Sequence, residues 1–110
     1  MTTRPNDPPI PHYAVIFSNQ RCDGDDDLYE KTATAMADLA VQQPGYISHE
    51  SARDADGFGI TISYWTDEAS IKAWKLNVEH MAAQGMGRDL FYESFTVRIA
   101  RVESLRTWNL

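Results

Sequence analysis

Hydrophobic and polar residues follow two different periods along this chain, and the changes between them mark off six elements. The first is a run from His12 to Gln20 that is apolar at odd and even positions alike, with Tyr13-Ala14-Val15-Ile16-Phe17 at its centre. Such a run predicts a strand that is covered on both sides.

The next segment has the three- and four-residue spacing of an amphipathic helix, shared by Leu28, Thr32, Ala35, Met36, Leu39 and Ala40. It predicts a helix from about Asp26 to Gln43, which Pro44-Gly45 ends. The acidic run from Cys22 to Asp27 precedes it, where carboxylates favour the positive end of the helix dipole. Aspartates around a glycine also suggest calcium. The run lacks the spacing and closing glutamate of a calcium loop, so helix capping is the preferred interpretation.

Two runs rich in β-branched and aromatic residues come next, from Tyr46 to Arg53 and from Phe58 to Trp65. The short turn around Asp54-Ala55-Asp56-Gly57 predicts that they form a hairpin. In the second strand, side chains on one face are Phe58, Ile60, Ile62 and Tyr64, and those on the other are Gly59, Thr61, Ser63 and Trp65.

Thr66 is the predicted N-cap of a second helix, because Asp67 and Glu68 follow it in the first turn. The buried stripe of that helix is Ile71, Trp74, Val78 and Met81, and Gly85 and Gly87 end it. A last strand runs from Leu90 to Val102. It is longer than the usual length of about five or six residues, so we expect it to extend beyond its own sheet.

The order β-α-β-β-α-β predicts an α+β, ferredoxin-like split βαβ domain, with an antiparallel four-stranded sheet and both helices on one face. Residues 12–103 form this domain, residues 1–11 a proline-rich extended arm and residues 104–110 a tail. One layer of helices leaves the second face open. We expect a homodimer that packs sheet against sheet to cover the apolar side chains on that face. The residues expected to supply these side chains are Tyr13, Val15, Phe17, Phe95, Val97 and Ile99.

Composition narrows the classes of partner. The net charge of -6 disfavours nucleic acid and anionic membranes, since either would repel this chain. Cys22 is the only cysteine, which excludes an intramolecular disulfide and a thiolate metal site. The sequence shows no secretory leader and no run of 18 apolar residues, so the cytoplasm is the expected location.

Few residues are candidates for catalysis or ligand binding. Asn19 is polar where the first strand leaves the sheet, and either caps a turn or faces a ligand. Trp74 suits both a core position and a pocket wall. Trp65, at a strand end, is interpreted as structural. His49 and Glu50 project to opposite faces, and His49 is either a satisfied histidine or a general base.

Other classes of enzyme lack support. The phenols Tyr29, Tyr64 and Tyr92 are possible donors to a substrate, without a ranking among them. The chain has no Ser-His-Asp order, phosphate-binding loop or dinucleotide fingerprint, and therefore no signature of a hydrolase, kinase or nicotinamide enzyme.

The segment Ser63-Tyr64-Trp65-Thr66-Asp67-Glu68-Ala69-Ser70-Ile71-Lys72-Ala73-Trp74 resembles the antibiotic biosynthesis monooxygenase family. There a strand ending in Trp runs into an acidic helix start, with a second Trp along the helix. Pro44-Gly45-Tyr46, Glu79-His80-Met81-Ala82-Ala83 and the closing Val97-Arg98-Ile99-Ala100-Arg101-Val102 also fit, so the resemblance covers about His12 to Glu103.

The resemblance implies a dimeric α+β barrel with a pocket between sheet and helices. Its members include cofactor-free oxygenases of aromatic polyketides and haem-degrading enzymes. Asn19 and Trp74 match two residues of the haem-degrading members. Gln84 stands where those have a haem-ligating histidine, and His80 lies one helical turn earlier, so no cofactor is expected and haem binding is disfavoured.

The leading hypothesis is a cofactor-independent monooxygenase of a small, electron-rich aromatic compound such as a quinol. Asn19 and Trp74 would orient the substrate and His49 or His80 would act as the base; the remaining pocket residues are Tyr64, Trp65 and Gln84. The alternatives are a non-catalytic module that binds a small molecule or only dimerises, and a haem-degrading monooxygenase.

Overall fold

The structure, a computed structural model, describes residues 7–22, 26–83 and 91–110, with only the helical backbone given for 79–83. Its elements follow the predicted order: β1 (His12–Arg21), α1 (Asp26–Val41), β2 (Tyr46–Arg53), β3 (Phe58–Trp65), α2 (Glu68–Ala83) and β4 (Tyr92–Val102). The bounds of β2 and β3 are those predicted, whereas α1 ends two residues before the expected Gln43.

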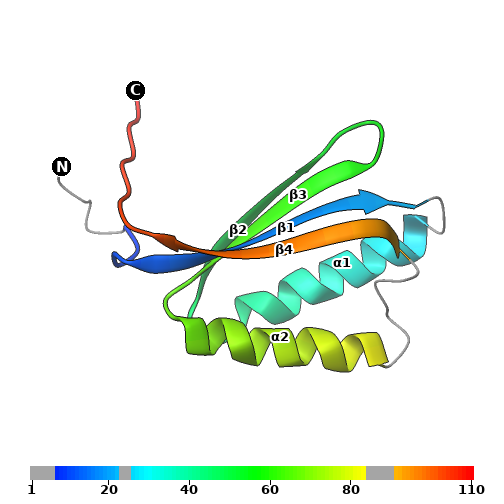
Figure 1. The fold of residues 1–110 in the computed structure, drawn as a ribbon, viewed down its shortest axis with the longest axis horizontal. Coiled ribbons are helices and arrows are strands. Elements are labelled where there is room, and N and C mark those ends of the chain that lie inside the picture. Colours follow the sequence, from blue (N-terminus) through cyan, green and yellow to red (C-terminus); the bar gives the residue numbers. More distant parts are fainter. Residues whose placement is uncertain (1–6, 23–25, 84–90) are drawn as a thin grey trace.

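The four strands form one antiparallel sheet in the order β2-β3-β1-β4, and both helices lie on the same side of it (Figure 1). This arrangement confirms the predicted ferredoxin-like fold. The helices lie side by side beneath the sheet, and neither of them covers the opposite face (Figure 1). We call that opposite side the open face. No helix among residues 7–22, 26–83 and 91–110 is long and apolar enough to cross a membrane.

Glycines set both reversals around the β2–β3 hairpin. Gly57 has a φ of 89° in the turn, where Asp54 Oδ1 accepts hydrogen bonds from the N–H groups of Asp56 (2.9 Å) and Phe58 (3.0 Å). Gly45, at a φ of 83°, ends the connection from α1, and its carbonyl accepts the Thr66 N–H at 2.8 Å. Both positive φ values are costly for residues with a Cβ, which explains glycine at these two positions.

Asp67, rather than the predicted Thr66, caps α2. Its Oδ1 accepts the backbone N–H of Ser70 at 2.7 Å, two residues into the helix from Glu68, which is the geometry of an N-cap. The hydrogen bond from the Ser70 backbone is the main reason that the pKa of Asp67 lies below its ordinary value. Thr66 instead donates its hydroxyl to Asp67 Oδ2 at 3.2 Å.

The last strand was predicted to extend beyond the sheet, and this prediction is wrong. β4 pairs with β1 along its length, from Arg21 opposite Tyr92 to His12 opposite Val102. The chain that projects beyond the sheet is the tail after Val102, which leaves on the side of the open face (Figure 1).

The apolar residues expected on the open face lie on the helix side instead. Trp65 marks that side because it stacks on Trp74 of α2, and Tyr13 is its partner in the β1–β3 register. By alternation the helix side also receives Val15, Phe17, Phe95, Val97 and Ile99. The open face carries a different apolar set, Ile16, Phe58, Ile60 and Ile62.

Candidate functional site

The helix side of the sheet has two chemically different halves. On β2 and β3 it carries mainly small and polar side chains: Ser51, Arg53, Gly59, Thr61 and Ser63. On β1 and β4 it carries the apolar residues Val15, Phe17, Phe95, Val97 and Ile99. A ligand between sheet and helices would therefore meet hydroxyl groups along one flank and an apolar wall along the other.

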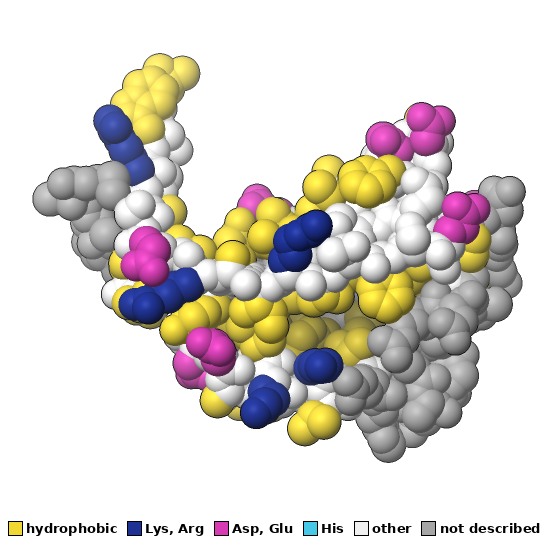
Figure 2. Space-filling view, in the orientation of Figure 1, with side chains coloured by type: hydrophobic (Ala, Val, Ile, Leu, Met, Phe, Trp, Pro, Cys, Tyr) yellow, Lys and Arg dark blue, Asp and Glu magenta, His cyan; other side chains and the backbone are white. Residues whose placement is uncertain are grey.

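This space opens to solvent beside β4. Phe95, Val97 and Ile99 are exposed although they face the helix side. Figure 2 shows a recess between β4 and α2 whose visible walls are largely hydrophobic side chains. Pockets for small organic ligands are typically lined in this way, with a few polar groups that fix orientation.

We call the side chains between the sheet and the two helices the helix-side layer. Two tryptophans form one end of this layer. The rings of Trp65 and Trp74 stack with centroids 6.0 Å apart and planes at 28°. Trp65 is completely buried and donates its Nε1–H to Ser63 Oγ at 2.8 Å, so it is a core residue with a satisfied polar atom. Trp74 is only half-buried. It is the member of the pair that can contact a ligand.

Asn19 is the most unusual polar side chain in the layer. It is 2% exposed, and its Oδ1 has no hydrogen-bond partner in the described part of the chain. Within the same described residues, its Nδ2 donates one long hydrogen bond, to the Phe17 carbonyl at 3.5 Å. Most buried polar side-chain atoms in proteins have a partner, because an unpaired one keeps its desolvation penalty. Asn19 lies between Gly59 and Phe95 in the register, at the border of the polar and apolar halves.

His49 lies on the same side of the sheet, opposite Ser63 of β3. A register shift between Tyr46 and Ser48 puts His49 on the face of Tyr46, not on that of Ile47 as strict alternation predicts. Tyr46 Oη and His49 Nδ1 are 2.6 Å apart, which leaves Nε2 as the second ring nitrogen. Tyr46 also packs edge-on against Trp65, with ring centroids 5.8 Å apart. The pair thereby joins His49, which is exposed, to the aromatic end of the layer.

The opposite end is closed by cations and phenols. The Arg21 guanidinium lies 3.9 Å from the centroid of the Tyr29 ring and pairs with Asp26 at 2.8 Å. Arg53 donates to Tyr29 Oη at 2.9 Å and lies over Gly59, where a Cβ would come within 2.8 Å of its Cζ. Burial first, and then the hydrogen bond with Tyr29, raise the pKa of Tyr92 well above its ordinary value, so this phenol stays protonated and is not a base at neutral pH.

The predicted site residues are only partly brought together. Asn19, His49, Trp65 and Trp74 lie on the helix side of the sheet. Tyr64 lies on the open face, where its hydroxyl donates to Glu50 Oε1 at 2.8 Å, and this bond is the main reason that its pKa is raised. Gln84 and the side chain of His80 lie outside the described residues.

Sequence reasoning missed two parts of this layer. The first is the pair of hydroxyl groups of Thr61 and Ser63. Strand alternation places them on the same face as Trp65, so they could have been assigned to the site if Trp65 had been known to face the helices. The second is the bond between Tyr46 and His49, which could not have been assigned, because it depends on a strand irregularity that leaves no mark in the pattern.

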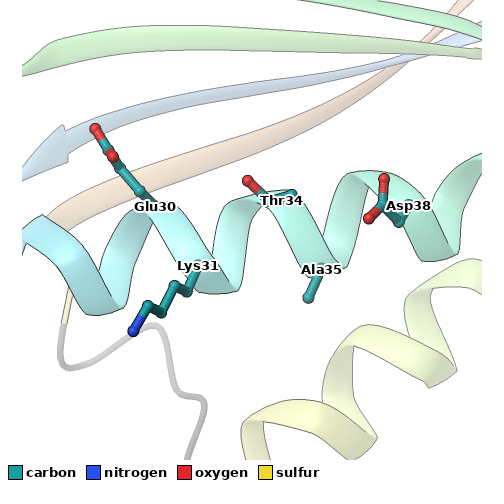
Figure 3. Close-up of a pocket in the computed structure, with 5 residues that line it drawn as sticks. All are labelled: Glu30, Lys31, Thr34, Ala35 and Asp38. Carbon is teal, nitrogen blue, oxygen red and sulfur yellow. The ribbon is translucent and has the colours of Figure 1, made fainter.

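Two surface depressions lie outside the recess between β4 and α2. One, of about 430 Å³, is lined by Glu30, Lys31, Thr34, Ala35 and Asp38. Figure 3 shows these side chains fanning out from successive turns of α1 without converging, which is typical of a solvated helix face. The other, of about 410 Å³, lies beside the hairpin turn and includes Arg21 and Arg53 with Asp26, Asp54 and Asp56. Its opposite charges largely offset one another.

Metal ligation finds no support in the part of the chain that the structure describes. No group of three or more His, Cys, Asp or Glu side chains there could hold a metal ion.

Comparison with known proteins gives one family. Residues 12–85 match the family described as antibiotic biosynthesis monooxygenase. An uncharacterised protein of Bacillus subtilis, YqjZ, is 46% identical over 99 residues, which cover 90% of this chain and 86% of that protein. A jasmonate monooxygenase of Pyricularia oryzae is 27% identical over 92 residues, or 82% of this chain but only 43% of the fungal protein.

Solved structures show the same fold at low identity. SnoaB of Streptomyces nogalater, described as a cofactor-independent oxygenase, has a TM-score of 0.64 at 17% identity, covering 88% of this chain and 96% of its own. A dimeric ferredoxin-like protein of unknown function from Thermobifida fusca has a TM-score of 0.65 at 14% identity, covering 84% and 92%.

Proposed function

Because this chain belongs to the antibiotic biosynthesis monooxygenase family, we propose that it is a cofactor-independent monooxygenase of a small, electron-rich aromatic compound. The observation that carries the proposal is the buried Asn19 amide, whose Oδ1 has no hydrogen-bond partner among the residues that the structure describes. A substrate hydroxyl would supply the missing donor. The names of the Streptomyces and Pyricularia relatives support the same class of reaction.

The chemistry needs an acidic C–H or O–H in the substrate. Once a base removes that proton, the electron-rich anion can reduce O₂ and form a carbon–oxygen bond to it. For an anthrone, R₂CH₂ + O₂ gives R₂C=O + H₂O, so one oxygen atom enters the substrate and the other leaves as water. The substrate supplies all the electrons. The protein has to bind, remove a proton and stabilise an oxyanion.

The helix-side layer offers a group for each task. Trp74 and the apolar residues of β1 and β4 form a wall for an aromatic ring. The amide of Asn19 can accept from a substrate hydroxyl through Oδ1 and donate to the developing oxyanion through Nδ2. His49 is the candidate base through Nε2, in the tautomer whose Nδ1–H donates to Tyr46 Oη.

Oxygen consumption tests the proposal directly. The purified protein, without added cofactor, should consume one O₂ per molecule of substrate and release one water. An anthrone should give the quinone, and a quinol with a free ring C–H should give the hydroxyquinone. Asn19→Leu, which is close in volume but apolar, should reduce the rate by at least about tenfold, the loss expected when a single stabilising hydrogen-bonding group is removed. Tyr64→Phe is the matched control, because Tyr64 lies on the open face. Equal rates for Asn19→Leu and the parent protein would remove Asn19 from the mechanism, and absence of turnover across the panel would leave a non-catalytic binding module.

A homodimer through the open faces is part of the same proposal. Phe58 and Ile60 are exposed on that face, and Ile16 and Ile62 lie beside them in the register. An apolar strip on an uncovered sheet is typical of a protein interface. The Thermobifida structure of the same fold is described as dimeric, which is consistent with a dimer but does not identify the paired faces.

A further inference from the structure

The C-terminal tail is the least covered apolar segment in the described part of the molecule. Residues 103–110 have no regular secondary structure and leave β4 on the side of the open face (Figure 1). Trp108 is 71% exposed and Leu110 is fully exposed. Two exposed apolar side chains of this size, two residues apart on one projecting segment, together form an apolar patch that another surface can cover.

The exposed apolar residues of the open face lie far from the start of this tail. Phe58 and Ile60 are at the hairpin end of β3, whereas the tail begins beside Trp65 and His12, at the other end of the sheet. The seven residue steps from Phe58 to Trp65 correspond to about 23 Å along the strand. The tail and the uncovered patch are therefore at opposite ends of one face.

We propose that the tail of each protomer docks on a second copy of this chain, with Trp108 and Leu110 lying against the partner subunit's Phe58 and the partner subunit's Ile60. In this dimer the twofold axis runs between the two sheets, perpendicular to their strands. It therefore places the hairpin end of the second sheet opposite the tail end of the first. It brings each tail to the other copy's hairpin end. The contact is then made twice, as an isologous dimer requires. This exchange of tails goes beyond the face-to-face pairing proposed above.

Length permits the contact. Residues 103–110 are eight residues, which span up to about 26 Å when extended. Packed sheets lie about 10 Å apart, so the tail can cross to the partner and still cover a hairpin end.

Charge favours the same orientation. The hairpin turn carries Asp54 and Asp56, both exposed, and the tail carries Arg106 two residues before Trp108. Arg53, near the turn, already donates hydrogen bonds to Tyr29 Oη and to the Gly57 carbonyl. In the exchanged arrangement Arg106 approaches the acidic turn. If the tails met each other instead, their arginines would be placed close together.

Disulfide trapping between two singly substituted chains tests the proposal. In a Cys22→Ser background, one population carries Trp108→Cys and the other Ile60→Cys, distinguished by mass. After mixing and mild oxidation, the mixed disulfide should dominate, because the tail of one chain meets the hairpin end of the other. Trp108→Cys mixed with Ala69→Cys, an exposed position on α2, reports random collisions.

Removal of residues 104–110 gives a second measurement. The shortened chain should keep its fold and show a dimer dissociation constant raised at least about tenfold in analytical ultracentrifugation, the effect expected when an apolar anchor is lost. A disulfide between two Trp108→Cys chains, a dimer that yields no mixed disulfide, or unchanged dimerisation of the shortened chain would each overturn the exchange of tails. A full-length monomer would overturn it together with the face-to-face pairing. Oxygen consumption, measured on the same samples, reports separately on the proposed reaction.

Discussion

At the scale of single residues, Asn19 and Trp65 illustrate opposite uses of a buried polar atom. Trp65 Nε1 is buried and satisfied by Ser63 Oγ, so it contributes to stability. Asn19 Oδ1 is buried and has no partner among the described residues, so it detracts from stability in the free protein. Proteins retain such groups mainly where function needs them, since apolar replacements would be more stable.

Asn19→Leu should therefore stabilise the protein while it reduces activity. Removing an unpaired buried amide and adding apolar surface should raise the free energy of unfolding by about 1 kcal/mol. Urea denaturation of the variant and the parent chain measures the change. A decrease in stability would mean that Asn19 has a structural partner in solution, and its assignment to ligand binding would lose its basis.

The stacked tryptophans should respond differently to the same substitution. Trp74→Phe should reduce turnover or ligand affinity while costing less than about 1 kcal/mol of unfolding free energy, because Trp74 is only half-buried. Trp65→Phe is the matched control. It should cost about 2 kcal/mol, since it leaves a cavity and an unpaired Ser63 hydroxyl. If both variants lose only stability, with activity per folded molecule unchanged, then neither ring contacts the substrate.

At the scale of elements, the start of α2 depends on one carboxylate. The bond from the Ser70 N–H to Asp67 lowers the pKa of Asp67, so its stabilising effect is present above the ordinary carboxyl pKa and is lost as the pH falls through the lower, folded value. Asp67→Ala should lower the melting temperature at neutral pH. Asp67→Asn, which keeps an N-cap acceptor, should lower it much less.

Melting temperatures measured from neutral pH into the acid range check this mechanism. The gap between Asp67→Ala and the parent chain should narrow as the parent carboxylate becomes protonated. A gap that stayed constant over that range would show that the ionised carboxylate is not what stabilises the helix start.

At the scale of the whole molecule, stability should depend on protein concentration. A dimer through the open faces would bury more than about 2,000 Å² if it is obligate, and its unfolding would then be coupled to dissociation. Each tenfold increase in concentration should add about 1.4 kcal/mol to the unfolding free energy per dimer. Ile60→Lys should abolish the dependence, whereas Leu76→Lys, an exposed residue of α2, should not. A melting temperature independent of concentration for the parent chain would contradict the dimer.

The sequence by itself determined the elements and their order. Local turn chemistry is strong around Asp54–Gly57 and Pro44-Gly45, where positive φ values require glycine, so β2 and β3 were placed to the residue. The resemblance to the family, based on residues such as Trp65 and Trp74, was likewise a matter of local pattern and was confirmed. Asn19 and Trp74 could be named as candidates from their positions alone.

Tertiary structure decided which side chains share a face, and the reason is the period of two in a strand. Nothing local shows which of the two faces meets the helices, so Tyr13, Val15 and Phe17 were expected on the wrong side. The register shift in β2 then turned His49 toward Tyr46. That Asn19 Oδ1 lacks a partner in the described structure follows from the packing of residues distant in sequence, which local sequence patterns do not show.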